Sequence, residues 1–343
     1  MTEIAFAPVD ELEGLTARLS PLGRLQRRLH AHPALGPFIV LVISFVIFGL
    51  INSRFFSATN VSLMLQQVAV VAALGVAQTL VILTAGIDLS IGAAMILAQM
   101  VMAQLAANNH VPGLLAILIG LCASLGTGAI TGLLVTRLRL PPFIASLGML
   151  SILTSTGLLY SNGQTIQASQ MPAILNWTGV YVNIGPFQLI NGVLLVIGLY
   201  FVVAYLLGQT AWGRHVYAVG DDIDAARLAG IRTNLVRFSV WVFAGLLIGI
   251  AAWVSIGYTG AASPNNAAGD LNLQSIVAVV IGGTSLFGGR GGVFGTLFGA
   301  LIVVVFTSGL TLANVNDLYQ PIAEGVLVIA AVGLDQWIRG VKV

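Results

Sequence analysis

The chain has 343 residues, of which 57% are hydrophobic and 8% are charged, and its mean hydropathy is +0.98. Soluble domains usually carry about a quarter charged residues, so this composition excludes a soluble globular fold and indicates a polytopic membrane protein. The net charge of +2 gives no indication of nucleic-acid binding, and the single Cys122 excludes a disulfide within the chain.

Long runs without any Asp, Glu, Lys or Arg divide the chain into membrane-spanning segments. They cover residues 55–87, 140–213, 239–269 and 291–316. A helix that crosses a hydrocarbon core of ~30 Å needs ~20 apolar residues. The runs are much longer than a barrel strand and do not alternate in polarity. The predicted fold class is therefore an all-α polytopic membrane protein.

Ten transmembrane helices are predicted from these runs and from the turn residues between them. They lie near residues 37–53, 62–84, 90–108, 113–136, 143–161, 187–208, 236–257, 271–287, 292–312 and 318–338. An even number of spans places both termini on one side, which we take as the cytosol. Of the 14 Lys and Arg residues, only Arg54 then lies outside. Cytoplasmic segments carry an excess of Lys and Arg, so both termini are predicted to be cytoplasmic.

The first 36 residues form a predicted cytoplasmic tail, 1–36. This tail lacks the apolar core of a signal peptide, so the first hydrophobic segment is itself a span. Ser20 and Pro21 are typical of a helix start. The leucines that follow share one face, which favours an interfacial helix over a disordered tail. Residues 37–338 form the predicted transmembrane domain, and 339–343 form a cytoplasmic C-terminal end.

Two external segments are predicted, at 162–186 and 258–270. The first contains Trp177 and Tyr181. Trp and Tyr favour the membrane–water boundary, so part of this segment is expected along the outer surface.

Two glycine-rich corners, 85–92 and 282–292, each lie between an inward-going and an outward-going span. Glycine allows close approach of helices and permits broken helices to be buried inside protein. The similarity of the two corners suggests a distant internal duplication.

The predicted cytoplasmic loop 209–235 contains an island of charge. Residues 213–232 hold three of the 14 basic residues of the chain and three of its 12 acidic residues. A short helix is predicted at 221–230, with aspartates capping its start and Gly230 ending it. It is either a docking surface for a cytosolic partner or a solvated loop. The residues predicted to form this docking surface are Asp221, Asp222, Asp224, Ala225, Ala226, Arg227, Leu228 and Gly230.

Asp88 is an acidic side chain at the turn between two spans. Carboxylates inside a membrane are costly and are functional candidates. The alternatives are a role in the pathway or gate, and capping of a helix that begins at Leu89 with Ser90 assisting.

Neutral polar side chains are candidates to line a path for a small uncharged polar solute, because such a solute needs donors and acceptors without charge. Hydrogen bonding between helices is the alternative role for each. The group comprises Gln66, Gln67, Gln78, Gln99, Ser263, Asn265 and Gln274. Glu324, about two turns into the last span, is a candidate for a gate or for helix packing. The candidates retained for the pathway and gate are Gln66, Gln67, Asp88, Ser90, Asn265, Gln274 and Glu324.

Motifs for catalysis or metal binding are missing. The sequence has no phosphate-binding loop, no nucleophile elbow and no pair of histidines at metal-ligand spacing. We therefore expect a transport subunit with no catalytic residue, no metal and no cofactor of its own, rather than an intramembrane enzyme.

Five stretches resemble the monosaccharide-transport permeases of ABC importers, of the ribose, xylose and fructose type. They read GIDLSIG at 86–92, LPPFIASLGM at 140–149, YSNG at 160–163, AARLAGI at 225–231 and IVAVVIGGTSLFGG at 276–289. Their order and intervals are similar to those of the family. The segment 221–230 is similar to the coupling loop that docks on the nucleotide-binding subunit.

The resemblance implies a permease subunit of an ATP-driven monosaccharide importer in the bacterial cytoplasmic (inner) membrane. Its implied partners are a cytosolic ABC ATPase that binds ATP and Mg, an external sugar-binding protein and a second copy of the chain in a homodimer. The alternatives are an ion-coupled secondary transporter, or the same importer carrying a polyol, a signal furanose or a branched-chain amino acid.

Three positions depart from the family pattern. Asn272 and Gln274 stand where relatives often have acidic residues, which bears on contacts near the outer mouth. Glu324 stands where relatives often have a basic residue.

Overall fold

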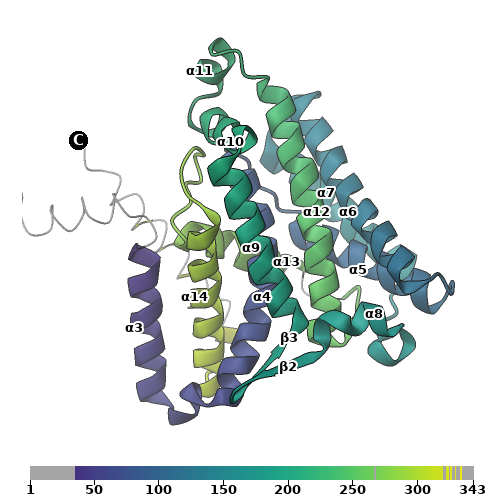
Figure 1. Cartoon of the computed structure of the whole chain (residues 1–343), viewed down its shortest axis with the longest axis vertical. Helices are drawn as coiled ribbons and strands as arrows, with labels where there is room; N and C mark the ends of the chain where they lie inside the picture. The colour runs from purple at the N-terminus through teal and green to yellow at the C-terminus, as the bar shows by residue number, and fades with distance from the viewer. Residues whose placement is uncertain are drawn as a thin grey trace, which may run out of the picture.

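Helices make up most of the computed structural model, which describes residues 35–265 and 268–319 and a few residues between 322 and 333. The axes of the long helices are roughly aligned, with α11 (Ile223–Leu228) at one end of the molecule and short strands at the other (Figure 1). We call these the α11 end and the strand end. The predicted tail helix in 1–36, most of the predicted span 318–338 and the C-terminal end 339–343 lie outside the described residues.

Within the described chain, nine helices coincide with predicted spans. They are α3 (Leu35–Ile51), α4 (Ala58–Leu83), α5 (Ile91–Ala107), α6 (Gly113–Thr136), α7 (Pro142–Ser161), α9 (Asn191–Gln209), α12 (Thr233–Thr259), α13 (Ala268–Ile281) and α14 (Val293–Leu312). Six of the described helices, namely α4, α6, α7, α9, α12 and α14, are long and apolar enough to cross a membrane. A multi-pass membrane protein follows from these helices.

The helices α5 and α13 are shorter than the predicted spans that they replace. With 17 and 14 residues, they reach ~26 Å and ~21 Å at ~1.5 Å per residue. The prediction of a span at 271–287 is wrong at its C-terminal end, because α13 stops at Ile281. Gly283 follows with φ +84°, a left-handed conformation that favours glycine and ends the helix.

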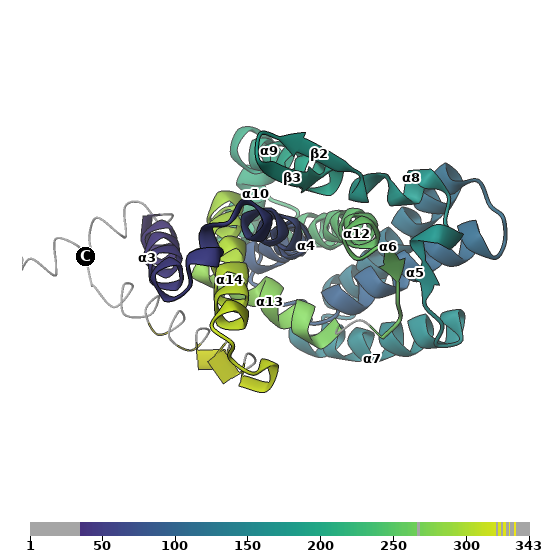
Figure 2. The same cartoon turned by 90° about the horizontal axis from the view of Figure 1, so that it is seen from below.

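The helix α4 lies at the centre of the bundle, between α12, α13 and α14 (Figure 2). Every residue from Val68 to Thr84 is buried. Neighbouring helices bind it through polar contacts: Tyr200 of α9 donates to the main-chain oxygen of Ala72 at 3.1 Å. The hydroxyls of Thr79 and Thr296 lie 2.7 Å apart and link α4 to α14.

Small residues allow α6 and α12 to pack closely. A Cβ atom added at Gly128 would lie 2.4 Å from the carbonyl oxygen of Trp241. Ser124 donates from its hydroxyl to the carbonyl oxygen of Gly245 at 2.7 Å. This packing mode is typical of membrane helices, where small side chains replace the hydrophobic driving force of water-soluble proteins.

The strand end corrects the all-α prediction. Strand β1 (Ile166–Gln167) pairs antiparallel with β4 (Ala261–Ala262), and β2 (Tyr181–Ile184) pairs with β3 (Phe187–Ile190). The predicted span 187–208 therefore begins with a strand, and α9 starts only at Asn191. Between β1 and β2 lie three short helices, η2 (Ala168–Gln170), α8 (Ala173–Asn176) and η3 (Trp177–Gly179).

The pairing of β1 with β4 joins the two predicted external segments. Thr165 donates to the hydroxyl of Ser263 at 3.0 Å, and the amide of Ala168 donates to the carbonyl of Gly260 at 2.8 Å. These contacts were not predictable from either segment alone, because each two-residue strand needs the other as its partner.

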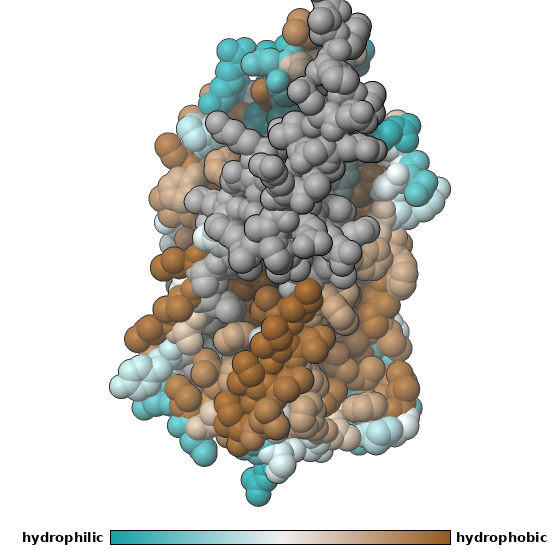
Figure 3. Space-filling view, turned by 90° about the vertical axis from the view of Figure 1, so that its left-hand side faces the viewer, coloured by the Kyte–Doolittle hydropathy of each residue, from teal (hydrophilic) through white to brown (hydrophobic). Residues whose placement is uncertain are grey.

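Apolar side chains cover the outside of the bundle. Figure 3 shows a broad hydrophobic surface below the grey atoms, on the side that carries α3. On that helix Leu50 is 83% exposed and Ile43 is 52% exposed. An apolar surface of this extent would be unfavourable in water and matches contact with lipid.

Two further short helices lie near the ends of the described chain, η1 (Ser53–Phe56) and η4 (Asp317–Tyr319).

Candidate coupling site

The segment between α9 and α12 forms two helices at the α11 end. Helix α10 (Ala211–Asp221) follows Thr210, whose hydroxyl caps it by accepting from the amide of Gly213 at 3.1 Å. Asp222 is extended, with φ −150°, and separates α10 from α11. The prediction of one helix at 221–230 is therefore wrong in its start, because Asp221 is the last residue of α10.

Both ends of α11 are capped. One carboxylate oxygen of Asp222 accepts hydrogen bonds from the amides of Asp224 and Ala225, each at 2.9 Å. Gly230 has φ +85°, and its amide donates to the carbonyl of Arg227 at 3.0 Å. The amide of Ile231 donates to the carbonyl of Ala226. This pair of bonds satisfies the last carbonyls of the helix, so the predicted aspartate cap and glycine stop are both present.

The predicted coupling residues differ in exposure. Ala226 is 5% exposed and packs against the chain itself, whereas Leu228 is 91% exposed. Arg227 and Asp224 form an exposed ion pair at 3.2 Å, which contributes little to stability in water. The exposed members of the predicted set are Asp221, Asp222, Asp224, Ala225, Arg227, Leu228 and Gly230. A large apolar side chain that projects from a capped, charged helix is well suited to enter a groove on another protein.

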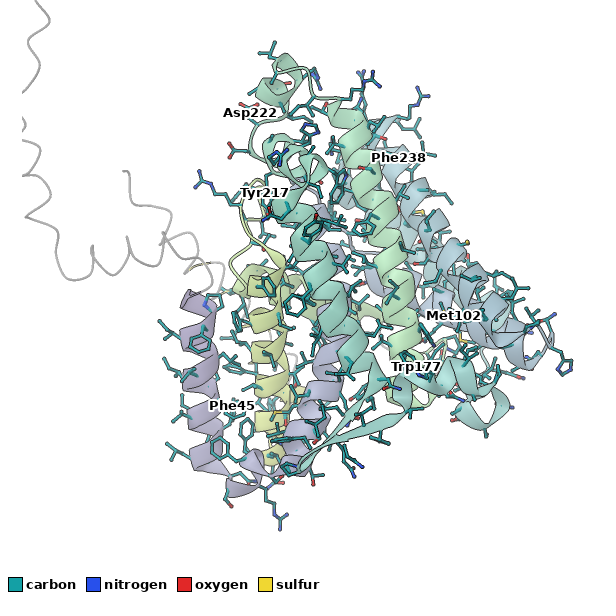
Figure 4. The ribbon with its side chains drawn as sticks, in the orientation of Figure 1. Phe45, Met102, Trp177, Tyr217, Asp222 and Phe238 are labelled. Atoms are coloured by element: carbon teal, nitrogen blue, oxygen red, sulfur yellow. The ribbon has the colours of Figure 1, made fainter. Side chains whose placement is uncertain are left out.

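Helix α10 is fastened to the glycine corner 282–292. In Figure 4, Asp222 lies at the tip of the molecule and Tyr217 lies below it on the same segment. The hydroxyl of Tyr217 donates to the carbonyl of Gly291 at 2.9 Å, and Trp212 donates to the hydroxyl of Ser239 in α12 at 2.8 Å. Helix α10 is thus linked, at its start and in its middle, to two other parts of the bundle.

Three backbones meet where α10 ends. A Cβ atom added at Gly220 would lie 1.8 Å from the carbonyl oxygen of Leu83, at the end of α4. A Cβ atom added at Gly289 would lie 2.7 Å from the Cα of Asp221. The amide of Gly289 also donates to the carbonyl of Leu83 at 3.0 Å. A displacement of α10 must therefore act on α4 and on the corner between α13 and α14.

Asp88 lies at the other glycine corner. Its side chain is 4% exposed, and one carboxylate oxygen accepts from both the amide and the hydroxyl of Ser90, at 2.8 Å and 2.6 Å. Helix α5 begins at Ile91, two residues later than the predicted start at Leu89. These bonds are compatible with bracing, and both predicted alternatives for Asp88 stay predictions.

Two buried side chains from other helices hold the same corner. Asn272 of α13 accepts from the amide of Gly92, at the first turn of α5. The hydroxyl of Ser146 in α7 donates to the carbonyl of Ile87 at 3.1 Å. The prediction for Asn272 concerned contacts near the outer mouth, but its side chain is 5% exposed and accepts from the amide of Gly92 in α5. Ser146 was not among the predicted site residues, since a serine in an apolar run has no local signal.

The pathway candidates among the described residues differ in their surroundings. Gln66 is buried and donates to the carbonyl of Gln188 in β3 at 2.9 Å, so it holds the β2–β3 hairpin. Gln67 lies half-buried one position further along α4. Asn265 is exposed, and its amide lies 3.4 Å from the hydroxyl of Ser263.

Of the remaining pathway candidates, Gln274 is half-buried on α13, and Glu324 lies outside the described residues. Gln99 donates to the carbonyl of Ser263 at 3.0 Å.

Gln78 is the candidate whose surroundings differ most from an ordinary packing role. It is fully buried in α4, and within the described chain neither its side-chain oxygen nor its nitrogen has a hydrogen-bond partner. Leaving a buried amide unsatisfied costs about 1–3 kcal/mol.

The sequence matches a known family over most of its length. Residues 60–332 match the family described as the branched-chain amino acid transport system, permease component. The chain belongs to this family.

Three curated relatives show how far the similarity extends. The fructose import permease protein FrcC of Rhizobium meliloti is 47% identical over 93% of this chain and 90% of its own length. The ribose import permease protein RbsC of Escherichia coli K12 is 35% identical over 87% of this chain and 92% of its own. The D-allose transport system permease protein AlsC of the same strain is 33% identical, over 88% and 91%. The predicted resemblance to sugar import permeases is confirmed.

Proposed function

We propose that this chain is the membrane-spanning permease subunit of an ATP-driven importer for a monosaccharide, located in the bacterial cytoplasmic (inner) membrane. The observation that carries the proposal is the capped helix α11. It exposes Leu228 and Arg227, and it is joined through α10 to the inner ends of α4, α13 and α14. Because Leu228 projects away from the rest of the chain, we infer that α11 binds a partner subunit.

In this proposal ATP and Mg bind to a separate cytosolic ATPase, which grips α11. Closure of the ATPase pushes α11 and α10, and the contacts at Gly220, Tyr217 and Gly289 pass the movement to α4 and the corner 282–292. Rocking of these helices in two copies of the chain then exchanges outward for inward access.

The strand end is the proposed docking place of the external sugar-binding protein. The pairing of β1 with β4 makes the two external segments one surface. Trp177 and Trp253 support it, with ring centroids 5.6 Å apart. Trp177 is 44% exposed, which suits a contact that one face of the ring makes with a partner.

The cargo is proposed from the relatives. The permeases named above carry fructose, ribose and allose in their names, and the fructose permease has the highest identity of the three. A hexose such as fructose is the first choice, with pentoses such as ribose or xylose next. In such importers the external receptor selects the sugar, so the permease needs only weak, uncharged contacts along its path.

The proposed topology has ten spans with both termini in the cytosol. It places α11 on the cytosolic side, where the ATPase lies, and Arg54 outside. Its support is the asymmetry of Lys and Arg between the two sides.

The substitution Leu228→Ser tests ATPase coupling. In cells that contain the ATPase and the sugar-binding protein, uptake of labelled fructose is expected to fall about tenfold or more, as at an interface hot spot. The ATPase should co-purify less with the variant permease. The amount of permease in the membrane should stay normal, because the Leu228 side chain is almost fully exposed.

The matched control is Leu235→Ser, on the first turn of α12, where the leucine is 60% exposed. This variant should keep uptake and ATPase association. Equal uptake by the two variants would contradict docking on α11. Uptake driven by an ion gradient in vesicles that lack the ATPase would instead establish a secondary transporter.

A further inference from the structure

A basic pocket opens beside α11. Its volume is about 580 Å³, and it lies between the end of α6, the connection to α7, α11 and the first turns of α12. Its polar and charged lining residues are Thr136, Arg139, Arg227, Asn234 and Arg237. No acidic side chain is among the residues that line it; Asp224 lies next to it, paired with Arg227.

Arg237 brings the most enclosed positive charge to the pocket. It projects from α12 and is half-buried. An anion in the pocket would pair with the positive charge of its guanidinium group, and Arg139 adds a second guanidinium group to the lining.

The start of α7 adds to the positive potential. Pro141 is the N-cap of α7 and Pro142 its first residue, both line the pocket, and no side chain caps the helix. The N-terminal end of a helix carries partial positive charge, which favours an anion, although neither proline has an amide hydrogen to donate.

Exposed apolar side chains are chain neighbours of the lining residues. Leu138 is 65% exposed, and on α7 Phe143 and Ile144 are 50% and 58% exposed. A soluble anion gains nothing from this surface, whereas the acyl chains of a lipid would cover it. Basic pockets between membrane helices on the cytoplasmic side are suited to anionic headgroups.

We propose that this pocket binds the phosphodiester headgroup of an acidic phospholipid. Arg237 and Arg139 hold the phosphate oxygens, and the acyl chains lie along the exposed face of α7. Because Ile223 and Arg227 of α11 also line the pocket, the bound lipid touches the helix that is proposed to couple with the ATPase. Acidic lipid therefore supports the position of α11.

Lipid retention by the purified full-length permease tests the site. The protein is extracted in mild detergent and equilibrated with vesicles of phosphatidylcholine that contain phosphatidylglycerol, and the bound lipid is measured by native mass spectrometry. Wild-type protein should retain phosphatidylglycerol in preference to phosphatidylcholine. Arg237→Gln and Arg139→Gln should each lower this preference about fivefold, and Arg237→Lys should keep most of it.

The controls separate a specific site from general attraction to positive charge. Arg214→Gln changes an exposed arginine of α10 outside the pocket, and Arg54→Gln changes one near the strand end. Both should retain lipid like the wild type. A monodisperse elution profile for each variant excludes misfolding.

Two results would overturn the proposal. One is equal loss of phosphatidylglycerol in Arg237→Gln and Arg214→Gln. The other is equal retention of phosphatidylglycerol and phosphatidylcholine by the wild-type protein, together with binding of free glycerol phosphate. The measurement involves no transport or ATPase, so it stands apart from the test at Leu228.

Discussion

The phenol of Tyr217 donates a hydrogen bond to the main-chain oxygen of Gly291 at 2.9 Å and thereby ties α10 to the corner between α13 and α14. These residues lie 74 positions apart in the chain. In the proposed mechanism the bond is one of the few links that transmit a push on α11 to the membrane helices. Its loss should therefore affect transmission more than stability.

The substitution Tyr217→Phe removes this bond and leaves the ring in place. A neutral hydrogen bond contributes about 0.5–1.5 kcal/mol to folding, so the variant should still reach the membrane. We expect fewer sugar molecules imported for each ATP hydrolysed, measured with the reconstituted importer in proteoliposomes. Tyr205→Phe, at a tyrosine of α9 that is 64% exposed, should leave this ratio unchanged. An unchanged ratio in Tyr217→Phe would show that the bond transmits nothing.

The substitution Gly220→Ala should destabilise the junction of α10 with α4. The added Cβ would lie 1.8 Å from the carbonyl of Leu83, and backbone atoms cannot move aside as a flexible side chain can. Overpacking of this kind costs about 1–3 kcal/mol or more. Thermal unfolding in detergent should show a lowered Tm. Gly198→Ala, in a part of α9 with open space around the glycine, should keep or raise it, and equal Tm values would argue against the close contact.

Substitutions at Asp88 separate bracing from charge-dependent gating. Asp88→Asn keeps an oxygen that can accept from the amide and hydroxyl of Ser90, whereas Asp88→Ala removes it. If the residue braces the corner, Asp88→Asn should transport sugar and Asp88→Ala should lose about 1–3 kcal/mol of stability through unsatisfied donors. Uptake assays and unfolding curves measure the two effects. Loss of transport in a normally folded Asp88→Asn protein would establish a role for the charge.

Single-cysteine labelling tests the orientation. With Cys122 replaced by serine, a cysteine at Arg54 should react with a membrane-impermeant maleimide in intact cells. A cysteine at Arg214 should react only after the membrane is opened. Both arginines are exposed, so access to the side chain does not limit either reaction. The reverse pattern would place α11 outside and end the coupling proposal.

Helix positions were largely predictable because each long helix has a strong local signal. The predicted span 113–136 has the bounds of α6, and 143–161 differs from α7 by one residue. Apolar runs bounded by proline, glycine or charge suffice for this. The β2–β3 strands were missed, since their residues are as apolar as the span that follows and only the hairpin partner distinguishes them.

The candidate site was predictable in part. The aspartate cap and glycine stop of α11 depend on a few adjacent residues, so the local sequence indicates them. The burial of Ala226 and the exposure of Leu228 depend on how the helix lies against the rest of the chain. The sequence therefore could not tell which of the two faces a partner.

The sequence alone determined that this is a membrane protein of helical spans, with an isolated charged helix and a distinctive set of permease motifs. Composition and local order are enough for that, because bilayer thickness and helix caps act on neighbouring residues. Only the tertiary structure decided that Gly220, Leu83 and Gly289 meet at one point, and that Arg139 and Arg237 share a pocket. Contacts between distant segments arise from the packing of whole helices, which no local pattern specifies.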